Sequence, residues 1–336
     1  MIRVLCLHLP EQQASYRYRV EQFQPYWEQY GIEMSCVCIV GKNYYEKLIL
    51  ALKSRHYDYV WLQKKPLSPF IINLITSRSR LVYDYDDALY ARQSGRTGRV
   101  TSTHAGSPHL VSRINYILSQ SSLVFAGSET LYHYAARFNP DRVHLVPTAY
   151  CGSVELFTDM DRSGEVTVGW IGGNHNMVYL RLVDEATSFL QQRYPFLRFS
   201  IMSGRPPEGL RTVWDFVPWS LEAEQPWLRS IDIGIMPLDD DEWCRGKCAF
   251  KLLQYMAYGK PVVASSVGEN CRAVIHGRSG YLASTSGEWM DYLALLLDDG
   301  DRRALFGAEG RRLLLANYDR EVVQKSIAGL LTGCSF

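Results

Sequence analysis

The sequence predicts an α/β protein with two Rossmann-like domains that face each other across a cleft. Its 336 residues are enough for two domains of about 150 residues each. Hydrophobic residues make up 47% of the chain and charged residues 21%, which are globular proportions. Short apolar runs alternate with helical patterns through both halves, which is typical of parallel sheets covered by helices on both faces.

The first half, residues 1–150, is predicted to form a Rossmann-like domain. Its strands are expected at residues 2–9, 32–40, 57–63, 80–85, 122–126 and 142–147, with helical patterns between most of them, one of which runs over 16–30. The loop-like stretch 148–164 separates this series from the next and marks the domain boundary.

The second half repeats the alternation and is predicted to form a second Rossmann-like domain over residues 165–315. Strands are expected at 165–171, 197–203, 213–217, 231–237, 261–265, 272–275 and 280–283, and helices at 176–193, 221–230 and 249–258. The last segment, 316–336, is expected to be a helix that packs back on the first domain. Ligands bind at the carboxyl ends of strands in such sheets, so two facing domains predict a substrate cleft.

The net charge of +1, from 36 basic and 35 acidic residues, excludes a strongly basic nucleic-acid binder. The two halves differ, however. Residues 1–150 hold 17 basic and 11 acidic residues, a net charge of +6, whereas residues 151–336 hold 19 and 24, a net charge of −5. The basic half would suit an anionic acceptor or a peripheral contact with a membrane.

Targeting and redox signals place the chain in the cytoplasm. No apolar run reaches 18 residues, and the run at the amino terminus is too short for a secretory signal. The eight cysteines include no C-x-x-C pair, which fits reduced thiols. Cys244 and Cys248 have no matching second pair, so no metal is expected there.

The most informative stretch, 231–270, reads as strand, loop, helix, tight turn and strand. Gly246 lets the backbone approach a ligand, and the free N–H groups at a helix start favour an anion. Arg245, Lys247 and Lys251 add positive charge at the same helix start. Basic side chains there oppose the helix dipole unless an anion offsets them, so this segment predicts a diphosphate site, with lysines that merely solvate a helix end as the alternative.

This stretch resembles the retaining nucleotide-sugar glycosyltransferases of family 4, which have the glycosyltransferase B fold. It carries the family's Ala-x-Gly-x-Pro-Val-Val-Ala-Ser pattern and downstream glycine at Ala257, Gly259, Pro261, Val262, Val263, Ala264, Ser265 and Gly268. The resemblance covers most of residues 165–320, and it implies that the domain 165–315 binds a nucleotide-sugar donor and the domain 1–150 binds the acceptor. It implies transfer of a glucose-type hexose from a UDP-sugar to an acceptor hydroxyl, with retention and without a metal or other cofactor. The acceptor would be a saccharide or a lipid-linked glycan, as in polysaccharide or glycolipid biosynthesis.

The chain departs from the family at its Glu-x7-Glu pair, and a variant subgroup that lacks the pair is the nearest match. The first Glu of the family holds donor-sugar hydroxyls and the second holds the ribose; Gly246 and Gln254 stand at these positions. Gln254 can still hydrogen-bond a ribose. Sugar recognition would pass to the backbone of Cys248, Ala249 and Phe250 or to neighbouring residues such as Glu242.

A second glycine site follows the first strand of the second domain. Gly172 and Gly173 permit close approach of a phosphate, and Asn174 can donate a hydrogen bond or cap a helix. The family's Arg and Lys are missing at this place, so Arg205 is expected to help the two lysines of the helix start to neutralise the diphosphate and act in catalysis. By the resemblance, the backbone of Val217 would contact the base.

Trp219 is expected near the base, with simple packing as the alternative. In the first domain, Asp86 and Asp87 follow a strand and are expected to bind acceptor or donor hydroxyls in the reaction, with a helix N-cap as the alternative.

Acceptor binding is expected at Asp84, Arg17 and Arg19, the arginines having a solvated helix start as their alternative reading. Arg96 lies in the loop 91–109, which is either an ordinary surface loop or a basic lid over an anionic acceptor.

Three other functional classes stay open. Arg205, after strand 197–203, stands where an NADP-dependent oxidoreductase places its 2′-phosphate clamp, although G-W-I-G-G-N is not the G-x-G-x-x-G fingerprint. A nucleotide-sugar epimerase or hydrolase would act without an acceptor. A non-catalytic nucleotide-sugar binding protein is compatible with the lost Glu pair.

Overall fold

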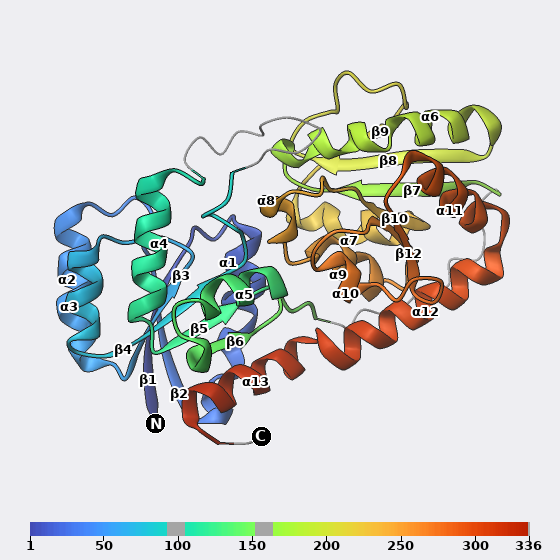
Figure 1. The fold of residues 1–336 in the computed structure, drawn as a ribbon. Coiled ribbons are helices and arrows are strands. Elements are labelled where there is room, and N and C mark those ends of the chain that lie inside the picture. Colours follow the sequence, from blue (N-terminus) through green and yellow to red (C-terminus); the bar gives the residue numbers. More distant parts are fainter. Residues whose placement is uncertain (93–104, 152–163, 335–336) are drawn as a thin grey trace.

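The computed structural model describes residues 1–92, 105–151 and 164–334 (Figure 1). It contains two six-stranded sheets with strand orders β2-β1-β3-β4-β5-β6 and β12-β11-β10-β7-β8-β9. Every named strand pair is parallel. Helices cover both sheets, and this two-domain α/β architecture confirms the predicted fold class.

The first domain contains the first sheet and the helices between its strands. Its strands are β1 (Ile2–His8), β2 (Ile32–Cys38), β3 (Tyr59–Gln63), β4 (Arg80–Tyr85), β5 (Leu123–Ala126) and β6 (Val143–Leu145). Its helices are α1 (Ala14–Arg19), α2 (Tyr44–Lys53), α3 (Pro69–Thr76), α4 (Pro108–Gln120) and α5 (Glu129–Ala136). Every residue of β3 is buried, as expected of a strand covered on both faces.

The helix expected over 16–30 is wrong beyond Arg19. The chain continues there as two short 3₁₀ segments, Glu21–Tyr26 and Glu28–Tyr30. Pro25 lies inside the first of them and has no N–H to donate, which disfavours a continuous α-helix.

The second domain contains the second sheet. Its strands are β7 (Val166–Ile171), β8 (Leu197–Ser203), β9 (Asp215–Pro218), β10 (Ile233–Met236), β11 (Val262–Ser265) and β12 (Gly280–Ala283). Its helices are α6 (Asp184–Arg193), α7 (Leu221–Ser230), α8 (Glu242–Arg245), α9 (Phe250–Ala257), α10 (Asn270–Ala273), α11 (Ser286–Asp298) and α12 (Gly300–Asn317).

Two sequence expectations for this domain are corrected. The strand expected at 272–275 is replaced by α10, whose Asn270 side chain donates to the Ser265 carbonyl at 3.0 Å and anchors a helical turn. A short apolar run does not distinguish a strand from a helical turn. The helix expected over 176–193 is α-helical only from Asp184, because Asn174–Leu182 forms a 3₁₀ segment.

The chain leaves the first domain after Tyr150 and returns to it with α13 (Arg320–Thr332), and the two segments meet in a bridge between Tyr150 and Asp319. Helix α13 lies along the first domain (Figure 1). The Gln324 side chain of this helix donates to the Phe23 carbonyl at 3.0 Å. At the bridge itself, the Tyr150 N–H donates to the Tyr318 carbonyl at 2.9 Å.

Helix α12 packs directly on the turn that follows α9, and Gly307 is the contact point. A Cβ atom at Gly307 would lie 1.8 Å from the carbonyl oxygen of Gly259. Gly307→Ala is therefore expected to lower the free energy of unfolding by about 1–3 kcal/mol, since backbone cannot rotate away. Urea unfolding would measure the change.

Gly287→Ala is the matched control, because the nearest atom to its new Cβ would be Thr285 Oγ1 at 4.0 Å. Alanine there should leave stability unchanged or slightly higher. Equal stabilities of the two variants would show that α12 does not pack this closely.

Candidate active site

A cavity of about 730 Å³ lies between the two domains, a size typical of small-molecule sites. Segments that follow β1 and β4 line it from the first domain. The segments after β7 and β8 and the start of α9 line it from the second. The cavity therefore lies at the carboxyl ends of strands from both sheets, where ligands of α/β proteins bind.

Two lysines give one side of the cavity a positive charge. The stem of Lys251 crosses Gly172 so closely that a Cβ there would lie 2.7 Å from Lys251 Cε. Its ammonium lies 5.2 Å from the ring of Trp170, and the Lys247 ammonium donates to Asn176 Oδ1 at 3.3 Å. Among the described residues, no carboxylate forms an ion pair with either lysine. Two basic side chains without a counter-carboxylate make this a candidate anion site.

The pKa of Lys251 reflects the same surroundings. Burial and the neighbouring charge of Lys247 lower it to about 7. Burial also lowers the pKa of His175, which lines the cavity beside them. An anion bound here would restore the protonated form of Lys251.

The predicted glycine site joins this anion site. Gly172, Gly173 and Asn174 line the cavity where β7 ends. The Asn174 side chain stands over Gly204, where a Cβ would meet Asn174 Oδ1 at 2.9 Å. The structure thus brings the glycine site to the helix start, as a diphosphate site requires.

Backbone strain marks the start of α9. Among the described residues, two that are not glycine have positive φ: Ala249 at 52° and Lys64 at 56°. Cys248, Ala249 and Phe250 all line the cavity, so the strained turn sets the helix start at the anion site. Strain of this kind persists where surrounding structure enforces it, often at functional sites.

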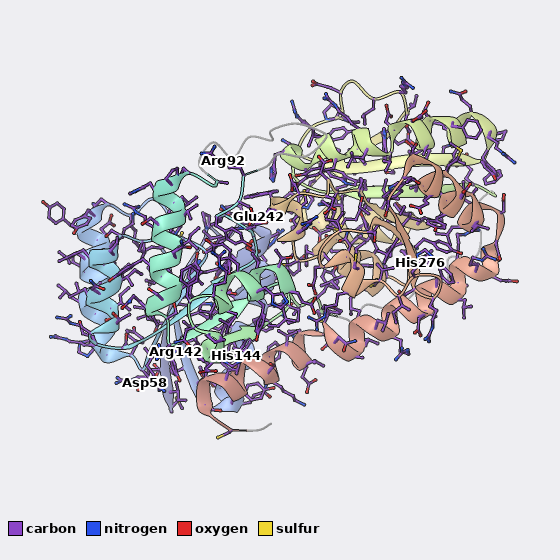
Figure 2. The ribbon with its side chains drawn as sticks, in the orientation of Figure 1. Asp58, Arg92, Arg142, His144, Glu242 and His276 are labelled. Carbon is purple, nitrogen blue, oxygen red and sulfur yellow. The ribbon has the colours of Figure 1, made fainter. Side chains whose placement is uncertain are left out.

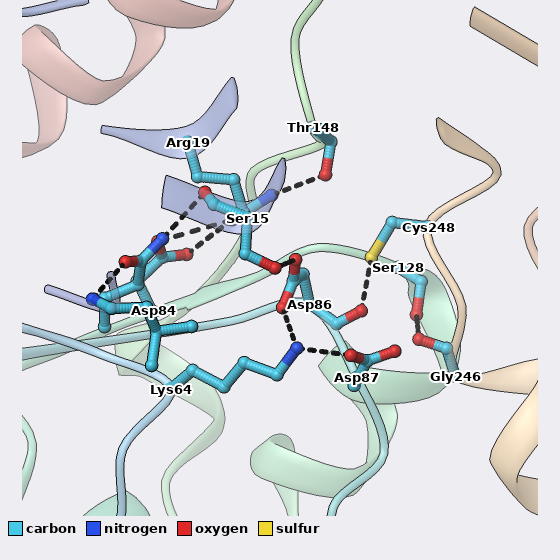
Figure 3. Close-up of polar contacts among 12 residues, drawn as sticks. Ser15, Arg19, Lys64, Asp84, Asp86, Asp87, Ser128, Thr148, Gly246 and Cys248 are labelled. Carbon is cyan, nitrogen blue, oxygen red and sulfur yellow. Dashed lines mark hydrogen bonds and ion pairs between the residues drawn. The ribbon is translucent and has the colours of Figure 1, made fainter. Parts of the chain in front are cut away.

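Asp86 and Asp87 line the cavity from the first domain, and Lys64 bridges them (Figure 3). The Lys64 ammonium lies 2.9 Å from Asp86 Oδ1, and the Ser15 hydroxyl donates to the same carboxylate. Burial raises the pKa of Asp86, but Lys64 and Arg19 outweigh it, so the pKa lies below its ordinary value. The sequence analysis missed Lys64, although it directly follows β3, next to β4 in the sheet.

Arg19 and Asp84 are not placed to contact an acceptor, contrary to expectation. Both side chains are buried, and Arg19 Nη2 lies 2.5 Å from Asp84 Oδ1 (Figure 3). The guanidinium also donates to Thr148 Oγ1 at 3.1 Å and to the Val146 carbonyl at 3.0 Å. Their donors and acceptors are used within the first domain, so the pair stabilises that domain and does not face the cavity.

Arg205 and Arg245 are likewise not at the cavity. Arg205 is more than half exposed and lies 3.9 Å from Glu208. Arg245 is also exposed and pairs with Asp240 at 2.6 Å. The expected diphosphate contacts of both arginines are corrected: each side chain points to solvent with a carboxylate of its own.

Gly246 faces the first domain rather than a donor sugar. A Cβ there would lie 2.5 Å from the Cβ of Ala88, and the Gly246 carbonyl accepts from Ser128 Oγ at 3.3 Å. The first domain occupies the space that a glutamate side chain would need. Val217 lies in edge strand β9 and does not line the cavity either, so its contact with a base stays a prediction.

Arg17 of the first domain and Trp219 of the second both line the cavity, and their side chains are in contact. The guanidinium carbon of Arg17 lies 4.9 Å from the Trp219 ring. Arg96 lies outside the described residues. Arg92, at the start of that loop, is labelled in Figure 2, and its side chain donates to the Gly106 carbonyl at 3.2 Å.

Neither a metal cluster nor a membrane span is found in the part of the chain that the structure describes. No three His, Cys, Asp or Glu side chains there could hold a metal ion together. No helix there is both long and apolar enough to cross a bilayer. A metal-free reaction, a peripheral membrane contact and a cytoplasmic location stay predictions.

Comparisons with known proteins agree with this arrangement. Residues 165–299 match the family model described as glycosyl transferases group 1. A D-inositol 3-phosphate glycosyltransferase of Pseudarthrobacter chlorophenolicus is 25% identical over 242 residues, which are 64% of this chain and 55% of that protein. The chain thus spans about half the length of this curated relative.

Solved structures show the same fold over the whole chain. HepE of Anabaena, in complex with UDP and glucose, matches with a TM-score of 0.73 and 14% identity over 99% of this chain and 100% of its own. Sucrose-phosphate synthase of Thermosynechococcus elongatus matches with a TM-score of 0.73 and 14% identity over 98% of each chain. Residues 165–299 are therefore similar to group 1 glycosyltransferases, and the chain has the two-domain glycosyltransferase B fold.

Proposed function

We propose that this protein transfers a glucose-type hexose from a UDP-sugar to an acceptor hydroxyl with retention. The observation that carries the proposal is the pair Lys247 and Lys251, which faces the interdomain cavity without a counter-carboxylate among the described residues. A nucleoside diphosphate supplies the missing negative charge. The UDP and glucose in the HepE complex support this choice of donor.

The lysines would act on the leaving group. As the bond between the anomeric carbon and the diphosphate oxygen breaks, negative charge grows on that oxygen. Lys247, Lys251 and the first N–H groups of α9 stand ready to stabilise it. The acceptor oxygen then bonds to the anomeric carbon, and its proton passes to the departing phosphate on the same face. Retention follows, and no protein nucleophile is needed.

The first domain would hold the acceptor. Arg17 lines the cavity, and its Nε is buried without a hydrogen-bond partner among the described residues. Asp86 and Asp87 can accept hydrogen bonds from sugar hydroxyls. The net charge of +6 over residues 1–150 favours a lipid-linked or otherwise anionic acceptor at a membrane surface.

A thermal-shift comparison of UDP, UDP-glucose and NADPH tests the proposal, because a ligand that binds only the native state raises the unfolding midpoint. UDP and UDP-glucose should raise it and NADPH should not. A response to NADPH alone would favour the oxidoreductase. If the donor is converted without any acceptor, the protein is an epimerase or hydrolase, and if UDP binds but no donor is turned over, it is a binding protein.

UDP affinity is expected to fall as the pH rises above about 7. The pKa of Lys251 in the free protein is about 7, so above that pH the amine must take up a proton when the anion binds. The affinity should then fall by up to about tenfold per pH unit. Calorimetry in buffers of different ionisation enthalpy would measure the proton uptake.

The Lys251→Met variant should bind UDP more weakly, and its UDP affinity should no longer fall as the pH rises above 7. Unchanged proton uptake in Lys251→Met would assign the titration to another group. The free wild-type protein should also become more stable as the pH rises above 7, because the lysine keeps its proton when unfolded but not when folded.

A further inference from the structure

Glu224 is a buried carboxylate at the cavity that the sequence analysis did not single out. It lies on α7, is 5% exposed and lines the cavity. Three neutral groups donate to it: the Tyr18 hydroxyl to Oε1 at 2.9 Å, Gln254 Nε2 to Oε1 at 3.0 Å, and Trp219 Nε1 to Oε2 at 3.0 Å. Among the described residues, no cation pairs with it. Burial of a charge without an opposite charge beside it is costly, even when neutral groups donate hydrogen bonds to it.

Gln254 and Glu224 depend on each other. Because an ionised carboxylate only accepts hydrogen bonds, the amide nitrogen of Gln254 must face Glu224. A glutamate at 254 would bring two buried carboxylates together, which is strongly unfavourable. This place therefore holds one carboxylate, and it comes from α7 and not from α9.

Two acceptor positions stay open at the cavity. Glu224 Oε2 has one donor, Trp219 Nε1, and no described residue donates to Gln254 Oε1. Gln254 lies three residues after Lys251, which is a rise of about 4.5 Å along α9. The two acceptors thus lie about one helical turn beyond the diphosphate site, where the ribose of a nucleoside diphosphate follows its phosphates.

We propose that Glu224, held by Gln254, Trp219 and Tyr18, binds the ribose diol of the donor: one hydroxyl donates to Glu224 Oε2 and the other to Gln254 Oε1. This inference rests on the proposed function and adds the residue that selects ribose over deoxyribose. Hydrogen bonds to a carboxylate are stronger than hydrogen bonds between neutral groups. Tyr18 comes from α1 of the first domain, so both domains hold the carboxylate.

The test compares UDP with 2′-deoxy-UDP and 3′-deoxy-UDP by calorimetry in the wild-type protein and two variants. The wild type should prefer UDP roughly 10- to 100-fold over at least one deoxy analogue. Glu224→Gln should lower that preference about tenfold, because the remaining acceptor is neutral. The double variant Glu224→Gln with Gln254→Glu restores one carboxylate to the pair and should regain most of the preference.

Glu222→Gln is the matched control, since Glu222 lies on the exposed side of the same helix. It should keep the wild-type preference. Should Glu224→Gln not fold, the wild-type measurement decides: UDP bound no better than either deoxy analogue overturns the inference. Full preference in a folded Glu224→Gln variant overturns it as well. In both cases UDP binding that depends on Lys251 would leave the proposed function standing, whereas no UDP binding to the wild type would remove both.

Discussion

Lys251→Ala is expected to lower turnover of the UDP-sugar donor about 100-fold while the fold is retained, an effect typical of losing one preorganised contact to a developing oxyanion. The Lys251 amine lies at the basic side of the cavity, and its stem fills the space above Gly172. The loss should fall mainly on kcat, because the charge that the lysine stabilises grows as the leaving group departs. Release of UDP under saturating donor measures it, and the thermal midpoint reports on the fold.

Two control variants sharpen this result. Lys325→Ala removes an exposed lysine of α13 and should leave turnover unchanged. Arg205→Ala should do the same, because the structure places this arginine in solvent. An unaffected rate in Lys251→Ala, or a large loss in Arg205→Ala, would mean that the diphosphate binds elsewhere.

Arg19→Ala is expected to lower the free energy of unfolding by about 3–5 kcal/mol, because it leaves the Asp84 carboxylate buried without its charge partner. Both side chains are buried, and the guanidinium also holds Thr148 and the Val146 carbonyl. Urea unfolding followed by circular dichroism would measure the loss.

Removing both charges should cost less than removing one. The double variant Arg19→Met with Asp84→Leu leaves no unpaired charge and is expected to be clearly more stable than Arg19→Ala. If Arg19→Ala lost less than about 1 kcal/mol, the pair would behave like an exposed one. The buried position of Arg19 and Asp84 would then be incorrect.

The fold was largely predictable because its signal is local and repeated. Apolar runs and helical periods alternate through both halves. Each apolar run that forms a buried strand is long enough to be recognised in the sequence. The errors fall where that signal weakens. Pro25 interrupts the helical period after α1, and the short apolar run at 272–275 is a helical turn next to Asn270.

The site was predictable only where its residues are neighbours in sequence. Lys247 and Lys251 share one helix start, so their common role could be seen in the chain itself. Glu224 and Ala88 could not be found this way, because their roles depend on how the two domains meet. One signal was present for Glu224. It lies on the same face of α7 as the buried Trp227 and Leu228, and a carboxylate is rare on a buried face unless it has a partner or a function.

Two segments far apart in the sequence meet where the first domain ends. Tyr150 forms a bridge with Asp319, the residue that caps α13, and Gln324 of that helix is bonded to the first domain. The hydrogen bond from Tyr18 to Glu224 is a further contact between the domains, and it lies at the cavity. One carboxylate therefore both lines the cavity and joins the two domains, so a substitution at Glu224 removes an interdomain contact together with a cavity acceptor.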